Sequence, residues 1–153
     1  KACELAQEHL AHIDQERELR DYLESGILAT IPNCAVNGHP IQRLPNTTNI
    51  GFKYIQGEAI LLHLNHYGIC ASSGSACTSG SLEPSHVLRA MGLPYTVLHG
   101  SIRFSLSRYT TRQEVEEVLA VMPTIAERLR AFSPFKNDQA DRLQERQQAT
   151  VLS

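Results

Sequence analysis

The segment from Ala71 to Ser81 carries no large side chain. Every residue in it except Cys77 and Thr78 is serine, glycine or alanine. Such side chains bury little apolar surface, and serine and glycine raise the entropy cost of ordering the backbone. We therefore predict an exposed, mobile loop that carries one thiol at its middle and is held between two firmer elements.

Cys77 is the candidate reactive residue of this loop. A free cysteine is usually buried and inert, but the small polar neighbours of Cys77 argue against burial. Pro84 suits the first turn of a helix, and the positive end of a nearby helix favours the thiolate. The residues alone leave a chemical role and a purely structural role for Cys77 equally open.

Apolar residues at helical spacing predict four helices, in residues 1–24, 58–67, 84–91 and 112–132, with a stop of the first helix at Gly26. Alternation and β-branched residues predict strands in residues 27–31, 34–36, 47–55, 69–71 and 101–106, with a turn at Asn37-Gly38. Thr111 and Glu114 form a capping-box pattern for the last helix, which Pro123 is expected to kink. The order of elements predicts an α+β two-layer sandwich with a small, mostly antiparallel sheet.

Arg103 lies at the middle of the strand predicted for residues 101–106. Ile102, Phe104 and Leu106 alternate with the polar side chains, so Arg103 and its two serine neighbours are expected on the wet face. A guanidinium held there offers a fixed fork for a carboxylate or a phosphate. The alternative is an ordinary solvated arginine at the edge of a sheet.

The overall composition is that of one soluble globular domain. The 153 residues are 42% hydrophobic and carry a net charge of −2, which implies neither a nucleic acid partner nor a membrane partner. Four irregularly spaced cysteines predict a reducing cytoplasm rather than a disulfide framework. The chain lacks an initiator methionine and opens within a helix pattern, so we expect it to be a fragment.

Other candidate sites are weaker. Cys70 follows an apolar run and is expected in the core. The pairs His9/His12 and His63/His66 have a spacing that can hold a metal, but neither pair has an obvious third ligand. A phosphate-binding loop would need Gly-Lys-Ser/Thr after its glycines, and a phosphatase loop would need an arginine shortly after Cys77, so both readings fail.

Two long motifs resemble cysteine desulfurases, in the branch associated with nitrogen fixation (the NifS type). They are the segment from Ser72 to Gly92, SSGSACTSGSLEPSHVLRAMG, and the segment from Gly100 to Thr111, GSIRFSLSRYTT. The resemblance extends from about Gly38 to Pro134. It implies the C-terminal, small domain of a fold-type I enzyme that uses pyridoxal phosphate.

The resemblance also implies a chemistry and a set of partners. Such an enzyme takes sulfur from L-cysteine, releases L-alanine and passes the sulfur to an iron–sulfur scaffold protein. It acts as a homodimer. By position, Cys77 resembles the persulfide-forming cysteine, and Arg103 resembles the arginine that binds the substrate α-carboxylate.

The chain departs from the family's pattern at the residues that hold the cofactor. The family's Schiff-base lysine lies in a His-Lys motif, and none of Lys1, Lys53 and Lys136 lies in such a motif. We therefore expect this chain alone to hold no pyridoxal phosphate and to be inactive. Two alternatives stay open. The chain could be a stand-alone module that accepts a persulfide or docks a scaffold, or it could be a structural domain with an accidental thiol. The expected division is an opening helix (residues 1–26), the small domain (27–134) and a polar tail (135–153).

Overall fold

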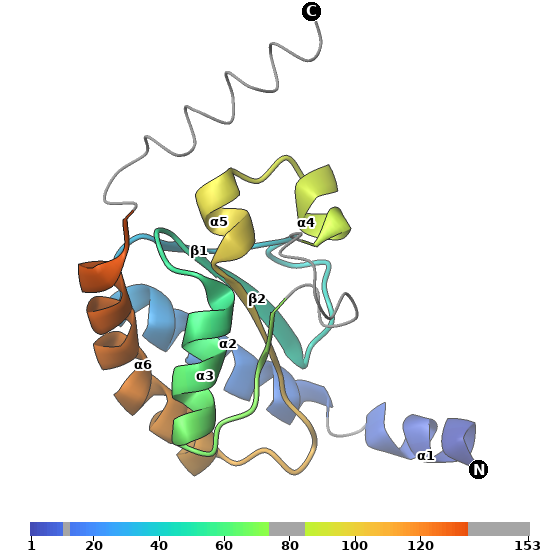
Figure 1. The fold of residues 1–153 in the computed structure, drawn as a ribbon. Coiled ribbons are helices and arrows are strands. Elements are labelled where there is room, and N and C mark those ends of the chain that lie inside the picture. The colour runs from blue at the N-terminus through green and yellow to red at the C-terminus, as the bar shows by residue number, and fades with distance from the viewer. Residues whose placement is uncertain (11–12, 74–84, 135–153) are drawn as a thin grey trace, which may run out of the picture.

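The computed structural model describes residues 1–10, 13–73 and 85–134 (Figure 1). These residues form a sheet with a layer of helices packed against one of its faces. The predicted α+β two-layer sandwich is therefore confirmed. None of the helices in these ranges is both long enough and apolar enough to cross a membrane.

Within the described residues the sheet has four strands: β1 (Cys34–Val36), β2 (Thr47–Phe52), β3 (Ser72–Ser73) and β4 (Ser101–Ser105). Their order across the sheet is β1-β2-β4-β3, and each neighbouring pair is antiparallel. The two longest strands, β2 and β4, therefore lie side by side at the centre.

Alternation along β2 and β4 places their apolar side chains on one face of the sheet. Ile50 and Phe52 of β2, and Ile102 and Phe104 of β4, are buried there. The helices α2 (Ile13–Thr30), α3 (Gly57–His66) and α6 (Arg112–Phe132) cover this face (Figure 1). The resulting core also contains Leu19, Leu23, Ile27, Ile60, Leu64, Val115, Val118, Met122 and Ile125.

Helix α6 begins as the capping-box pattern predicts. The Thr111 hydroxyl accepts a hydrogen bond from the Glu114 backbone N–H at 3.2 Å, and the Glu114 carboxylate accepts one from the Thr111 backbone N–H at 2.7 Å. These bonds satisfy two amide groups that a helix start otherwise leaves without partners. The hydrogen bonds from Thr111 also hold the pKa of the Glu114 carboxyl below its usual value. The helix continues through Pro123 to Phe132.

The predictions for the first thirty residues are wrong in two respects. The structure describes two helices, α1 (Ala2–His9) and α2, and α2 does not stop at Gly26 but runs to Thr30, where a strand was expected. Ile27 extends the buried stripe of α2 by one turn. A Cβ atom at Gly26 would lie 2.6 Å from the Leu119 side chain of α6, so glycine here permits close packing of the two helices.

Other elements also differ from the sequence predictions, and β2 ends at Phe52 rather than at residue 55. Strand β3 is Ser72–Ser73 rather than residues 69–71, and the helix expected in residues 84–91 is described as α4 (His86–Ala90). A short helix, α5 (Tyr95–His99), follows Pro94 and was not predicted. Val97 of α5 lies against Gly51 of β2, so α5 covers one end of the sheet face that the other helices leave open.

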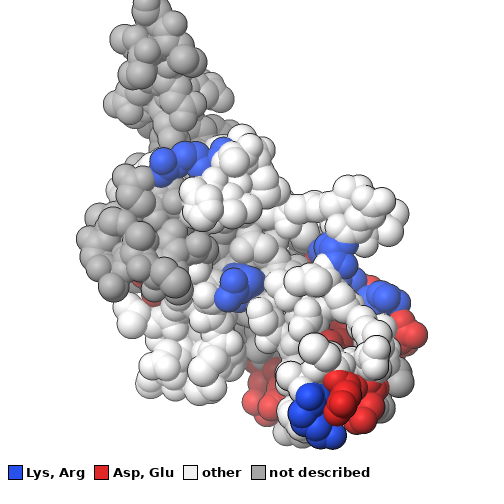
Figure 2. Space-filling view, turned by 90° about the vertical axis from the view of Figure 1, so that its right-hand side faces the viewer, with Lys and Arg blue, Asp and Glu red and all other residues white. Residues whose placement is uncertain are grey.

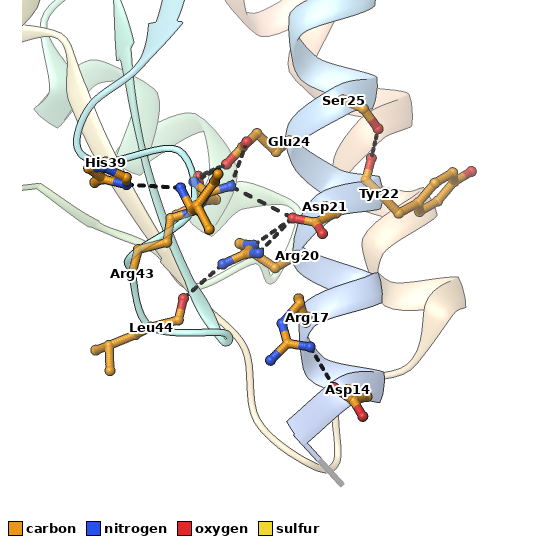
Figure 3. A network of polar contacts seen from close by, with 12 residues as sticks. Asp14, Arg17, Arg20, Asp21, Tyr22, Glu24, Ser25, His39, Arg43 and Leu44 are labelled. Carbon is orange, nitrogen blue, oxygen red and sulfur yellow. Dashed lines mark hydrogen bonds and ion pairs between the residues drawn. The ribbon is translucent and has the colours of Figure 1, made fainter.

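A cluster of charged side chains ties α2 to the loop before β2 (Figure 3). Arg43 donates two parallel hydrogen bonds to Glu24, at 2.7 and 2.8 Å, and the Thr48 hydroxyl donates to the same carboxylate at 2.6 Å. Arg20 pairs with Asp21 at 2.7 Å and donates to the backbone oxygen of Leu44 at 2.8 Å. These polar contacts hold the loop against α2, although the loop itself buries little apolar surface.

Candidate active site

A row of three side chains crosses the open face of the sheet. The strand register aligns Asn49 of β2 with Arg103 of β4, and Arg103 with Ser72 of β3. Directly opposed residues of antiparallel strands project from the same face, with their Cβ atoms about 5 Å apart. Arg103 therefore lies between an amide on one side and a hydroxyl on the other.

Arg103 has a fixed backbone and an exposed side chain. Its two neighbours along β4, Ile102 and Phe104, are buried in the core, while Arg103 is exposed as predicted. Among the residues that the structure describes, no hydrogen bond or ion pair involves its guanidinium. On the side of the molecule away from α6, Figure 2 shows basic side chains scattered over a largely uncharged surface, with most acidic side chains toward its lower and right-hand edges. Arg103 is thus placed to receive an anion from outside.

A polar network lies on the same face, beside Arg103. The Asn37 side-chain nitrogen donates to Asn49 Oδ1 at 2.7 Å and to the Ser101 hydroxyl oxygen at 3.0 Å, and the Ser101 hydroxyl donates to the Val97 backbone oxygen at 2.7 Å. Ser101 is buried, although its place in the alternation predicted a wet position, because Val97 of α5 lies over it. Asn37 and Asn49 were not predicted as site residues.

Cys77 lies outside the described residues, as does most of the predicted mobile loop. Ser73, the last residue of β3, precedes Cys77 by four positions. Because Ser72 pairs with Arg103, the thiol-bearing segment leaves the sheet from the strand next to the guanidinium. The roles of Cys77 and Arg103 stay predictions.

The cysteines in the described residues differ in their surroundings. Cys70 is exposed, so the expectation that it lies in the core is wrong: it follows α3 and the turn at Gly68, before β3 begins. Cys34 is half-buried, and its thiol donates to the Ile31 backbone oxygen at 2.9 Å. Burial raises the pKa of the Cys34 thiol, and the nearby Arg130 offsets this only in part.

We expect Cys34 to react with iodoacetamide at least about tenfold more slowly than Cys70, because exposure and thiolate fraction set the rate. The measurement is a brief labelling pulse on the folded 153-residue chain, followed by mass spectrometry of the two peptides. A denatured sample is the control and should label both thiols at similar rates. Equal labelling in the folded chain would show that Cys34 is not protected.

The histidine pairs do not form a metal centre in the described part of the chain. His63 and His66 both lie on α3, but no group of three or more histidine, cysteine, aspartate or glutamate side chains there is arranged to hold a metal ion. In the other pair, His9 and His12, the second histidine lies outside the described residues. His66 instead makes an edge-on ring contact with Tyr67.

Comparison with known families places the fold and the site in context. The family model of aminotransferase class-V matches residues 3–118. The chain therefore belongs to the aminotransferase class-V family.

The curated relatives confirm the resemblance to cysteine desulfurases. The chain is 74% identical to "Cysteine desulfurase 2" of Trichormus variabilis over 149 residues, covering 97% of this chain and 37% of that protein. It is 59% identical to "Cysteine desulfurase NifS" of Azotobacter vinelandii over 135 residues, covering 88% of this chain and 34% of that protein. The chain thus spans little more than a third of the length of these relatives.

Solved structures show the same fold. The chain matches a NifS-like protein from Rickettsia africae with a TM-score of 0.69 and 29% identity, over 80% of this chain and 31% of that one. A second NifS-like protein matches with a TM-score of 0.70 and 31% identity, over 82% of this chain and 31% of that one. The predicted α+β fold is therefore one that the chain shares with NifS-like proteins.

The described residues do not fit the pyridoxal phosphate that the family implies. The cofactor needs a lysine for its aldehyde, and the lysines in the described ranges are Lys1, before α1, and Lys53, after the end of β2. Lys53 lies four positions beyond Asn49 along the chain, which places it at the far end of the strand from the Arg103 row.

Proposed function

We propose that this chain is the C-terminal part of a cysteine desulfurase that supplies sulfur for iron–sulfur cluster assembly. One L-cysteine and the Cys77 thiol give one L-alanine and one Cys77 persulfide. The S–S bond forms as the C–S bond of the substrate breaks, and the released carbon takes up a proton. The observation that carries the proposal is the exposed Arg103 guanidinium, without a described partner, on the strand next to the one that leads to Cys77.

Arg103 would bind and orient the substrate. A guanidinium donates two parallel hydrogen bonds to a carboxylate, which fixes the direction of the bound molecule as well as its position. Holding the α-carboxylate at β4 would turn the substrate sulfur toward the thiol that follows β3. Cys77 would then accept the sulfur and carry it to an iron–sulfur scaffold protein. We further propose a homodimeric parent that works in the cytoplasm, whose reducing conditions keep the Cys77 thiol from forming a disulfide.

Pyridoxal phosphate would supply the electron sink for cleavage of the C–S bond. Because none of Lys1, Lys53 and Lys136 stands in the family's His-Lys motif, the 153-residue chain alone is expected to be inactive. The predicted division into residues 1–26, 27–134 and 135–153 belongs to the same proposal.

The test compares the 153-residue chain with the full-length protein. Both are incubated with L-cysteine, with and without pyridoxal phosphate, and L-alanine is measured. Formation of alanine by the loaded full-length protein, and not by the short chain, is the expected result. If the full-length protein forms none, but Cys77 of the short chain accepts persulfide sulfur from a complete desulfurase, the sulfur-accepting module is the correct reading.

A further inference from the structure

The direction of each hydrogen bond beside Arg103 follows from one backbone carbonyl. The Ser101 hydroxyl lies 2.7 Å from the Val97 oxygen, and a carbonyl can only accept, so the single hydroxyl proton is used there. Toward Asn37, Ser101 can therefore only accept, and Asn37 must present its NH2 group to it at 3.0 Å. The same NH2 group lies 2.7 Å from Asn49, so the Asn49 atom that faces it must be the carbonyl oxygen.

The amide of Asn49 is thereby turned so that its own NH2 group points away from Asn37. An asparagine amide has two N–H donors, and a hydrogen bond from Asn37 fixes the acceptor half of this one. In the described part of the chain, no acceptor is hydrogen-bonded to these two donors. Asn49 is half-buried, so the amide is ordered by its surroundings but still open on one side.

Arg103 is the residue of β4 directly opposite this amide. The Asn49 backbone oxygen accepts from the Asn37 backbone N–H at 2.8 Å, so the polar backbone groups of Asn49 face away from β4. Asn49 and Arg103 are therefore a non-hydrogen-bonded pair, in which the Cα atoms lie about 4.5 Å apart and the side chains are closest. An anion on the guanidinium would lie beside the Asn49 donors.

We propose that the Asn49 amide is a second donor to the substrate carboxylate that Arg103 binds. This inference rests on the proposed function. Two parallel hydrogen bonds from Arg103 leave other lone pairs of the carboxylate unused. The Asn49 NH2 group can donate to one of these lone pairs, because its own N–H groups have no acceptor among the described residues. Asn37 and Ser101 are positioning residues, because they hold the Asn49 amide in this orientation without reaching the substrate themselves.

Gly51 makes room for the positioning residues. A Cβ atom there would lie 2.5 Å from the Val97 side chain and 3.3 Å from the Asn37 side-chain nitrogen. Any side chain at position 51 would push both groups away. The glycine in β2 is thus explained by the network that orients Asn49.

The experiment replaces Asn49 with aspartate in the full-length protein loaded with pyridoxal phosphate. Asn49→Asp keeps the oxygen that accepts from Asn37, removes both donors and adds a charge that repels a carboxylate. We expect KM for L-cysteine to rise about 10- to 100-fold, with kcat changed less than about threefold. The inhibition constant of cysteamine, which is cysteine without its carboxylate, should change less than about threefold.

Two further variants separate the possible failures. Asn65→Asp makes the same change on the exposed surface of α3 and should leave both constants unaltered. If Arg103→Gln raises KM but a folded Asn49→Asp stays within twofold of the unmodified protein, the inference about Asn49 is wrong and the proposed function stands. If neither variant changes KM, the carboxylate site itself is wrong.

Folding is checked by thermal unfolding of each variant. If Asn49→Asp does not unfold cooperatively, Asn49→Ser takes its place. Serine adds no charge, and its side chain is too short for the hydroxyl to reach the carboxylate. It should raise KM for L-cysteine about tenfold and leave cysteamine unaffected. An equal effect on cysteine and cysteamine would contradict the proposal, because it would show that Asn49 does not distinguish the carboxylate.

Discussion

Replacing Arg103 with lysine in the full-length, cofactor-loaded protein is expected to lower kcat/KM for L-cysteine by about 10- to 150-fold. Lysine keeps the charge but loses the planar fork, and the loss of one charge-assisted hydrogen bond corresponds to a change of this size. Much of the change should appear in KM, because the carboxylate is bound before the reaction as well as during it.

Thermal stability should be unaffected by this substitution, because the Arg103 side chain is exposed and makes no described hydrogen bond. Arg128→Lys, a matched change at an exposed position of α6, is the control and should alter neither property. Activity of Arg103→Lys within twofold of the unmodified protein would remove Arg103 from the carboxylate site. Loss of the fold would show that Arg103 has a structural role instead.

The largest expected effect on stability is at Glu24. Its side chain and that of Arg43 are only 14% and 15% exposed, and Glu24→Ala would leave the mostly buried guanidinium without its bidentate partner. Removing one partner of a buried pair is strongly destabilising. Asp21 remains 3.7 Å from Arg43, which reduces the loss, so we expect the free energy of unfolding to fall by about 2–3 kcal/mol.

Glu116→Ala provides the matched control for Glu24→Ala. Glu116 pairs with Arg112 on the surface of α6, where both side chains are more than half exposed, and its removal should cost less than about 0.5 kcal/mol. Urea unfolding of the two variants gives both values. Equal losses would show that the pair of Glu24 and Arg43 contributes no more than a surface ion pair.

The same pair should make stability depend on pH. Burial alone would raise the pKa of the Glu24 carboxyl, but hydrogen bonds from Arg43 and Thr48 and the charges of Arg43 and Arg20 outweigh it, so the pKa lies below its ordinary value of 4.5. A carboxyl with a lowered pKa in the folded state stabilises the fold above its unfolded pKa. This contribution is lost as the pH falls through the lowered pKa. The difference in stability between the unmodified protein and Glu24→Ala should therefore be full at neutral pH and shrink below about pH 4.

Much of the fold could be predicted from the sequence because local patterns were strong. Phe104 and its alternating neighbours identified β4 and the exposed face that carries Arg103, and Thr111 with Glu114 identified the start of α6. The C-terminal end of α2 could not be predicted in this way, because a glycine such as Gly26 commonly ends a helix. Gly26 instead serves a contact with Leu119, which is 93 positions away in the sequence.

The candidate site was only half visible in the sequence. Arg103 is identified by its own strand, but Asn49 becomes relevant only through the register of β2 with β4, which one strand does not specify. The alternation along β2 puts Asn49 on the face opposite to that of the buried Ile50. This alternation was the only sign in the sequence that Asn49 could belong to the site. Asn37 was read only as part of a turn, because its partner Ser101 lies on a distant strand.

Transfer of sulfur from L-cysteine to Cys77 is expected to depend on the carboxylate contact that Arg103 makes. The most direct measurement is mass spectrometry of the full-length, cofactor-loaded protein after a brief exposure to L-cysteine without a reductant. The peptide with Cys77 is expected to gain the mass of one sulfur atom, the gain should fall sharply in Arg103→Lys, and the exposed Cys70 should gain none. Sulfur on Cys70 instead, or alanine formed with Cys77 unmodified, would contradict transfer of sulfur to Cys77.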